Sequence, residues 1–329
     1  MLEESSTMES QRSGVIIVGS VTADLTTFSH RLPSPGETIH GDEFTLVLGG
    51  KGANQAVAVG LAGADAHFVA CVGTDLFQSL IIDGLHGAGV GTEHVRAIEG
   101  ARTGIAHIRV DDSAENDIVM VPLANEHLSV DQIEEAFAKC SAASSVLLTQ
   151  LEIPSELSSY AIRRAREEGL TVLLDPAPAV PLDDSIWASI DIVTPNETEA
   201  RILTGITVSD ASSAEAAGRW FLERGAGAAI VTLASAGALL VTPDEVTAFA
   251  SIPVTSVDTT AAGDSFAGYL GAGIAQGMPL HDAIRLAGAA GALTVTQRGA
   301  SPSLPARRDV EALLATAELP APLSEGSRA

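Results

Sequence analysis

The chain has 329 residues, of which 46% are hydrophobic and only 4% aromatic, and it carries 42 acidic residues against 18 Lys and Arg. This length allows one large α/β domain or two smaller ones, with an aliphatic core of the kind that packs helices onto a parallel sheet. The formal net charge of −24 argues against nucleic acid and anionic membranes as partners, because such a surface repels polyanions.

The two ends of the chain and its two cysteines indicate where a folded domain lies. Residues 1–13 are polar and acidic, without the apolar run of a signal peptide. We expect a short disordered lead-in there, a folded domain over 14–317 and a flexible tail over 318–329. Cys71 and Cys140 stand alone in apolar surroundings, which is typical of reduced thiols in a reducing compartment. The sequence therefore predicts a cytoplasmic protein.

Short β-branched runs alternate with helical patterns along most of the chain. Strands are predicted at 14–20, 67–73, 144–150, 170–176, 191–196 and 228–234. Helices are predicted at 52–64, near 154–168, at 197–204, at 211–223, and as a small-residue series from 263 to about 317. This alternation indicates an α/β fold, whose central, mostly parallel sheet is flanked by helices on both faces.

Two segments, about 36–48 and 101–121, interrupt the alternation. Both alternate apolar with polar residues and contain no helical pattern. We expect antiparallel strands of a small sheet beside the main one, with the turn between two of them at 111–117. Such a flap serves as a lid or an interface in some α/β proteins and is an ordinary surface hairpin in others, and the pattern alone leaves both open.

The usual nucleotide-binding fingerprints are missing. No GxGxxG follows the first strand, and LGGKGAN (48–54) lacks the first glycine and the Ser or Thr of a Walker A loop. A dehydrogenase and a P-loop NTPase are therefore disfavoured. The glycines around Lys51 would still let the backbone approach a ligand closely. In that case Asn54 starts the helix that follows. The alternative is a plain strand-to-helix turn.

Several polar residues follow predicted strands directly. Asp24 and Glu152 each come after one, and Asn196 and Glu199 begin the helix after another. Each could be a turn or helix cap. Their shared location favours a site, because ligands of open α/β sheets gather at the carboxyl ends of the strands. The last two residues could hold phosphate and, through water, Mg²⁺.

Asp264 lies in TTAAGDSFAG (259–268), at the first turn of a predicted helix. A helix N-terminus exposes unpaired N–H groups and carries partial positive charge, so it binds anions. Asp264 could simply cap this helix. It could also act as a base beside a phosphate that these N–H groups hold.

The motifs GGKGANQAVA, PGET, TPNETEA and DTTAAGDSFAG together resemble the ribokinase-like sugar kinases, in matching order over about residues 14–308. The resemblance implies a ribokinase-like α/β fold with a small β-sheet lid, through which two copies form a homodimer. It also implies transfer of phosphate from ATP to the 5-hydroxyl of D-ribose, with Mg²⁺ and a stimulating K⁺. A sibling activity on 2-deoxyribose, another pentose or a nucleoside is the alternative. A silent sugar-binding relative is disfavoured because Asp264 is intact.

By position, the resemblance implies that Asp264 is the catalytic base and that Ala262 and Gly263 belong to an anion hole. Sugar binding is implied for Thr22, Asp24, Gly50, Lys51, Asn54, Glu152 and Asp264. ATP binding is implied for Asn196, Thr232, Ala234, Gly237, Gly263 and Gly288, with Glu199 binding Mg²⁺ through water. A K⁺ site, made mainly of carbonyl oxygens, is implied at Asp258, Thr260, Thr294, Gln297, Gly299 and Ser303.

Three positions depart from the family pattern. Thr22 stands where these kinases usually have an Asn that bonds a sugar hydroxyl, and Thr has a shorter arm. Ala234 replaces a usual Gly in the nucleotide loop, and Ala236 replaces a commonly basic residue. We expect the two alanines to alter ATP contacts modestly. Thr22 is expected to loosen the choice of sugar.

Overall fold

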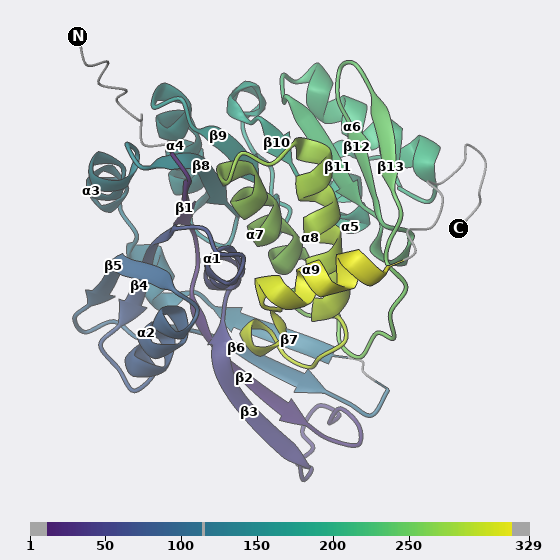
Figure 1. Ribbon diagram of the computed structural model, residues 1–329. Helices are drawn as coiled ribbons and strands as arrows, with labels where there is room; N and C mark the ends of the chain where they lie inside the picture. Colours follow the sequence, from purple (N-terminus) through teal and green to yellow (C-terminus); the bar gives the residue numbers. More distant parts are fainter. Residues whose placement is uncertain (1–11, 114–115, 318–329) are drawn as a thin grey trace.

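The computed structural model describes residues 12–113 and 116–317 (Figure 1). The main sheet within them consists of β1 (Gly14–Val18), β4 (Ala66–Gly73), β5 (Val90–Ile98), β8 (Ser144–Thr149), β9 (Thr171–Leu174), β10 (Ile192–Val193), β11 (Ala228–Thr232), β12 (Ala238–Val241) and β13 (Val246–Phe249). The strand order is β13-β12-β11-β10-β9-β8-β1-β4-β5. The pairings from β5 to β11 are parallel, and β12 and β13 add antiparallel strands at one edge.

Helices cover both faces of this sheet, which confirms the expected layered α/β architecture. They are α1 (Lys51–Leu61), α2 (Gln78–Gly87), α3 (Val130–Cys140), α4 (Ser155–Glu167), α5 (Glu197–Thr204), α6 (Ala211–Glu223), α7 (Ala262–Ala275), α8 (Leu280–Thr294) and α9 (Arg307–Thr316). Val15 and Ile17 of β1 pack with α1, α2, α7, α8 and α9, whereas Ile16 and Val18 pack with α3, α4 and α6. Successive residues of a strand point to opposite faces, so β1 contributes to both cores.

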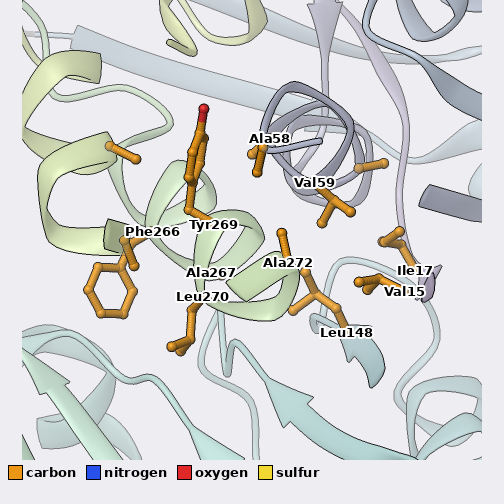
Figure 2. Close-up of a cluster of buried hydrophobic side chains, with 14 of the residues drawn as sticks. Val15, Ile17, Ala58, Val59, Leu148, Phe266, Ala267, Tyr269, Leu270 and Ala272 are labelled. Atoms are coloured by element: carbon orange, nitrogen blue, oxygen red, sulfur yellow. The ribbon is translucent and has the colours of Figure 1, made fainter. Parts of the chain in front are cut away.

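The helices α1 and α7 contribute buried side chains to one hydrophobic cluster (Figure 2). A Cβ atom added at Gly268 of α7 would lie 2.4 Å from the Cβ of Ala58 and 2.7 Å from the carbonyl oxygen of Gln55, both on α1. A side chain at this position would therefore force the two helices apart. The small residues of this region bring the first turns of α1 and α7 side by side over the sheet.

A second sheet of four described strands lies beside the main one (Figure 1). It contains β2 (Thr22–Phe28), β3 (Glu43–Gly49), β6 (Gly104–Val110) and β7 (Asn116–Val121), in the order β3-β2-β6-β7. The two expected segments form antiparallel pairs, β2–β3 and β6–β7, whereas the central pair β2–β6 is parallel. This pair involves β2, which the sequence did not predict, since only Gly19, Ser20 and Val21 separate it from β1. We call this sheet the small sheet.

Most predicted elements are confirmed, and two have the bounds expected: α5 and α6. The first predicted helix begins at Lys51, so the expectation that Asn54 starts it is wrong. The segment 36–48 forms a strand only from Glu43, and the strand predicted at 191–196 is reduced to two residues. α2, α3, β5, β12 and β13 were not predicted.

Part of the predicted turn at 111–117, most of the expected lead-in and the expected tail lie outside the described residues. Cys71 and Cys140 are free and buried. No described helix is both long and apolar enough to cross a membrane.

Candidate active site

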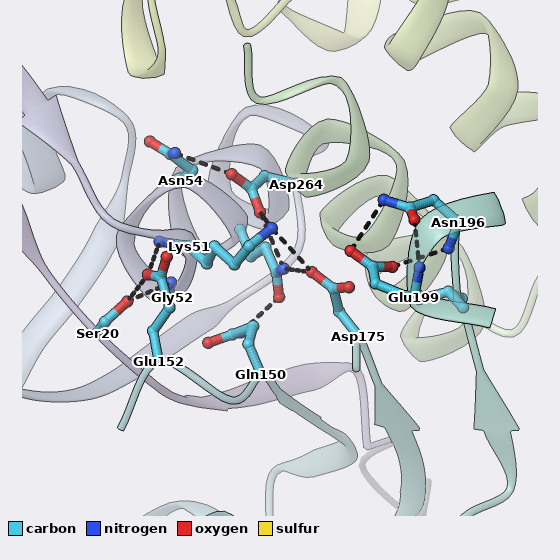
Figure 3. Close-up of polar contacts among 12 residues, drawn as sticks. Ser20, Lys51, Gly52, Asn54, Gln150, Glu152, Asp175, Asn196, Glu199 and Asp264 are labelled. Carbon is cyan, nitrogen blue, oxygen red and sulfur yellow. Dashed lines mark hydrogen bonds and ion pairs between the residues drawn. The ribbon is translucent and has the colours of Figure 1, made fainter. Parts of the chain in front are cut away.

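Polar side chains from distant parts of the chain meet at the carboxyl ends of the main strands, beside the first turns of α1 and α7. Asp175 directly follows β9, and Glu152 lies just beyond β8. Figure 3 shows this group of residues: Ser20, Lys51, Gly52, Asn54, Gln150, Glu152, Asp175, Asn196, Glu199 and Asp264. The expected clustering at this edge of the sheet is therefore observed.

Asp264 is buried in the first turn of α7 and faces α1. Its Oδ2 accepts a hydrogen bond from Asn54 Nδ2 at 2.9 Å, and its Oδ1 accepts one from Gln55 Nε2 at 3.1 Å. The ammonium nitrogen of Lys51 lies 3.7 Å from Oδ1. The capping residue of α7 is Ala261, and no side-chain cap of this helix is found in the described residues. The capping interpretation of Asp264 is therefore not supported.

The backbone at the start of α7 has the form of an anion-binding turn. Ala261 has the left-handed backbone conformation, with φ 60°, and Ala262 N–H donates to Thr259 O at 3.3 Å. A Cβ added at Gly263 would meet nothing within 4 Å among the described atoms. Position 263 is thus unobstructed where a side chain would lie, and the N–H groups of a helix N-terminus of this kind can hold an anion.

Asp24 is a buried carboxylate in β2, the strand that links the two sheets. Thr22 Oγ1 donates to its Oδ1 at 2.6 Å. Gly49 leaves room for it, because a Cβ there would lie 2.0 Å from Asp24 Oδ2. Burial, together with the charges of Glu152 and Asp264, raises the pKa of Asp24 to about 6, although the bond from Thr22 lowers it.

The glycine-rich turn before α1 brings the backbone against the first strand. Gly50 has φ 87°, and a Cβ on it would lie 2.9 Å from Thr22 N. Glu152 Oε2 fixes this turn by accepting from Ser20 Oγ at 2.6 Å and from Lys51 N at 2.9 Å. Asn54 Oδ1 is buried and finds no hydrogen-bond partner in the part of the chain that the structure describes. A buried amide oxygen of this kind calls for a donor from a ligand.

Asn196 and Glu199 cap α5 reciprocally, which agrees with the capping alternative given for this motif. Glu199 N donates to Asn196 Oδ1 at 2.8 Å, and Asn196 N donates to Glu199 Oε2 at 2.8 Å. Burial raises the pKa of Glu199, although its bond from the Asn196 backbone lowers it. The Glu199 carboxylate still belongs to the site although it takes part in the capping box, because the charge of Lys51 lowers its pKa and that of Asp264 raises it.

The residues expected around a nucleotide lie at the start of α5, on β11 and its following loop, in the first turn of α7 and on α8. A backbone bridge pairs Asn196 with Thr232. Ala234 has φ 44°, and a Cβ on Gly237 would lie 2.0 Å from Phe249 O, so position 237 requires glycine. A Cβ added at Gly288 would meet no described atom within 4 Å.

The segment before α7 is tied to the segment after α8, where a monovalent cation was expected. Asp258 accepts from Thr260 N and Oγ1 through Oδ1, at 2.9 and 2.7 Å, and from Gly299 N through Oδ2, at 2.9 Å. Thr294 and Ser303 donate their hydroxyls to nearby backbone carbonyls, and no contact that joins Gln297 to Asp258 is seen in the described residues. The side-chain groups that these residues could offer to a cation as ligands are carboxylate, hydroxyl and amide oxygens, which suit a hard cation.

Four site residues were missed by the sequence reasoning: Ser20, Gln55, Gln150 and Asp175. Gln55 belongs to a helical pattern that favours a core helix, and its polar role depends on residues 120 and 209 positions away. Asp175 falls within the strand predicted at 170–176, so it was not recognised as a polar residue at a strand end. The signal that identified Glu152, an acid directly after a buried strand, could also have identified Asp175.

Residues 12–307 match the pfkB family carbohydrate kinase. The chain is 37% identical over 298 residues to the ribokinase of Haemophilus influenzae, with 91% of this chain and 97% of that protein covered. It is 33% identical over 295 residues to the deoxyribokinase of Salmonella typhi, with 88% and 95% covered. The solved structure of Arabidopsis thaliana ribokinase complexed with ribose and ATP has a TM-score of 0.84 at 32% identity, covering 92% of this chain and 98% of that one.

Proposed function

The chain belongs to the pfkB family of carbohydrate kinases, and from this membership we propose that it transfers the terminal phosphoryl group of ATP to the 5-hydroxyl of D-ribose. The observation that carries the proposal is the arrangement around Asp264. A buried carboxylate lies in the first turn of α7, beside the backbone N–H groups of the helix N-terminus and beside Asn54, whose amide oxygen lacks a partner among the described residues. The ribokinase relatives support ribose as the substrate.

In this mechanism Asp264 accepts the proton of the sugar hydroxyl as that oxygen attacks. A primary alcohol is a weak nucleophile, and a positioned carboxylate makes its attack possible. The N–H groups of Gly263 and Asp264 then stabilise the charge on the transferring phosphoryl group. Glu199 is suited to hold Mg²⁺ through water, and the ion, when bound with ATP, would supply further charge neutralisation.

The sugar is proposed to bind between Asp24, Asn54 and the turn at Gly50. The Asp24 carboxylate is buried with Thr22 as its one described hydrogen-bond donor, so it can accept bonds from sugar hydroxyls. A coupled assay of ADP release across pentoses, hexoses and nucleosides tests the proposal. Turnover with ribose supports it, and turnover only with another sugar selects the sibling activity. No turnover with any of them would indicate a silent sugar-binding relative.

Thr22 is expected to weaken the discrimination between ribose and 2-deoxyribose, the substrate class suggested by the deoxyribokinase relative. Its hydroxyl already donates to Asp24, so it retains only acceptor capacity towards a sugar. Thr22→Asn adds amide donors on a longer arm. We expect the ratio of kcat/KM for ribose over that for 2-deoxyribose to rise about fivefold, the equivalent of about 1 kcal/mol for one neutral hydrogen bond. An unchanged ratio would show that this position does not set specificity.

We also expect K⁺ to stimulate the enzyme. Asp258 ties the loop before α7 to Gly299, and a cation bound between these segments would stiffen the turn that carries the anion-binding N–H groups. A carbonyl-rich site favours the larger and more easily dehydrated ion, so rates should fall when K⁺ is replaced by Na⁺ or Li⁺ at equal ionic strength. Equal rates in all three salts would contradict the site.

The small sheet is proposed to act as a lid over the sugar and as the interface of a homodimer. Its edge strand β7 exposes four successive apolar side chains, Ile118, Val119, Met120 and Val121, and Phe44 of β3 is also exposed. Exposed apolar side chains on an edge strand, whose backbone groups can also pair with another chain, are typical of an interaction surface. The buried free thiols Cys71 and Cys140 support a cytoplasmic location for the protein.

A further inference from the structure

Gln55 of α1 is fully buried between two carboxylates. Its Nε2 donates to Asp175 Oδ2 at 2.7 Å and to Asp264 Oδ1 at 3.1 Å, and its Oε1 accepts from Gln150 Nε2 at 2.5 Å. A flipped amide would place its oxygen against both carboxylates and its nitrogen against the Gln150 amide donor. The orientation of Gln55 is therefore determined, and with it the bond that Gln55 donates to Asp264.

Lys51 is shared by the same two carboxylates (Figure 3). Its ammonium nitrogen lies 3.7 Å from Asp175 Oδ2 and 3.7 Å from Asp264 Oδ1. A base that is tightly paired with one cation is weakened, because the cation stabilises its ionised form. Asp175 also pairs with the Lys51 ammonium group, so the positive charge of Lys51 is shared between Asp175 and Asp264. The site is buried, and electrostatic effects are strong there. Asp264 therefore holds only a share of the Lys51 charge.

We propose that Asp175 is a positioning residue for phosphoryl transfer: through Gln55 and Lys51 it orients Asp264 and keeps Lys51 from being neutralised by Asp264 alone. This role rests on the proposed function of Asp264 as the base. Asp175 is assigned no contact with either substrate. Its effect is therefore expected in kcat, and the KM values should hardly change.

The charge of Asp175 should make this effect depend on pH. Burial raises its pKa to about 7; Glu199 of α5 and Asp264 of α7 raise it as well, whereas Lys51 and the Gln55 bond of α1 lower it. Above pH 7 Asp175 is ionised and shares Lys51. Below pH 7 its protonation leaves Lys51 to Asp264, so the base is weakened and kcat falls.

Asp175→Asn tests the proposal, because Asn has the same shape and still offers an oxygen to Gln55 but carries no charge. With ribose and ATP at pH 8 we expect kcat to fall about tenfold, with both KM values within about twofold of wild type. The wild-type rise of kcat between pH 6 and 8 should be absent from the variant. Asp309→Asn, in the first turn of α9, is the matched control and should retain the wild-type rate and pH profile.

Thermal unfolding at pH 8 separates this role from a merely structural one. The pKa of Asp175 is raised from 3.8 in the reference state to about 7, so its ionisation destabilises the folded protein increasingly from about pH 4 to pH 7. Asp175→Asn lacks this ionisation, and its unfolding midpoint should be higher than that of wild type at pH 8. A structural role would lower the midpoint and leave the pH profile unchanged.

The outcomes distinguish this proposal from the proposed function. A wild-type protein that turns over no sugar in the panel overturns both, and if another sugar is the substrate, the same comparison is made with that sugar. If the wild type is active and Asp175→Asn has the same kcat and pH profile as the wild type, only the role of Asp175 is overturned. If that variant does not fold, Gln150→Met, which removes the donor to Gln55 Oε1, should still lower kcat at unchanged KM, and an unaffected kcat overturns the proposal.

Discussion

Asp264→Asn is expected to lower kcat by at least ~10², the lower bound of what a general base contributes. Asn has nearly the same shape but cannot accept the proton of the sugar hydroxyl. Its amide nitrogen would also face a donor, from either Asn54 or Gln55, where Asp264 accepts from both. ATP binding should persist because the N–H groups at the start of α7 remain. Steady-state rates and calorimetric ATP titration measure the two effects.

The matched control is Asp282→Asn. Asp282, like Asp264, is an acid in the first turn of its helix, but it is exposed and pairs with Arg285. The control should keep the wild-type kcat. If Asp264→Asn also kept a rate near that of wild type while folding normally, Asp264 would be excluded as the base.

Asp24→Ala is expected to raise the KM for the sugar by roughly 10² or more and to leave the KM for ATP unchanged. A hydrogen bond to a charged group contributes about 1.5–3 kcal/mol, and we expect this carboxylate to accept two sugar hydroxyls. Gly49→Ala should act in the same direction, because the new Cβ would lie 2.0 Å from Asp24 Oδ2 and displace it. Gly87→Ala is its control, since a Cβ there meets no described atom within 4 Å.

The same carboxylate predicts how sugar binding depends on pH. Since burial raises the pKa of Asp24 to about 6, a proton binds there as the pH falls below 6. The protonated group accepts fewer hydrogen bonds, so the KM for the sugar should rise in that range. Measurements of sugar KM at pH 5, 6 and 8 check this. An Asp24→Ala variant with the wild-type sugar KM would contradict the binding role itself.

The sequence predicted most strands of the main sheet and the gathering of polar residues at their carboxyl ends, because these signals are local. Buried strands that alternate with helices are visible in short windows, and Glu152 and Asp264 stand near the end of a strand and at the start of a helix. The small sheet was harder to predict. Its strand β2 follows β1 so closely that the two merge in the pattern, and the parallel pairing of β2 with β6 depends on contacts between distant segments.

The missed polar residues have a different cause. Gln55 lies in the middle of α1, and Gln150 follows a run of buried aliphatic residues, so both favour a core interpretation. Their function becomes visible only when α7, which is some two hundred positions away in the chain, is placed beside α1. Helical periodicity specifies which face is buried but not which partner that face meets.

The missing side chain at Gly268 has a consequence for how the active site can vary. Asp264 and Gly268 lie one turn apart on α7, so the spacing that keeps α1 against α7 also sets the distance between the acid and the amides of Asn54 and Gln55. A methyl group at position 268 would push α7 away from α1. It would thereby move Asp264 away from Asn54 and Gln55, although none of these three residues is changed. An apolar substitution in the core can therefore abolish the activity of the enzyme. Variants that differ in sugar specificity have to keep glycine at position 268, where α7 contacts α1.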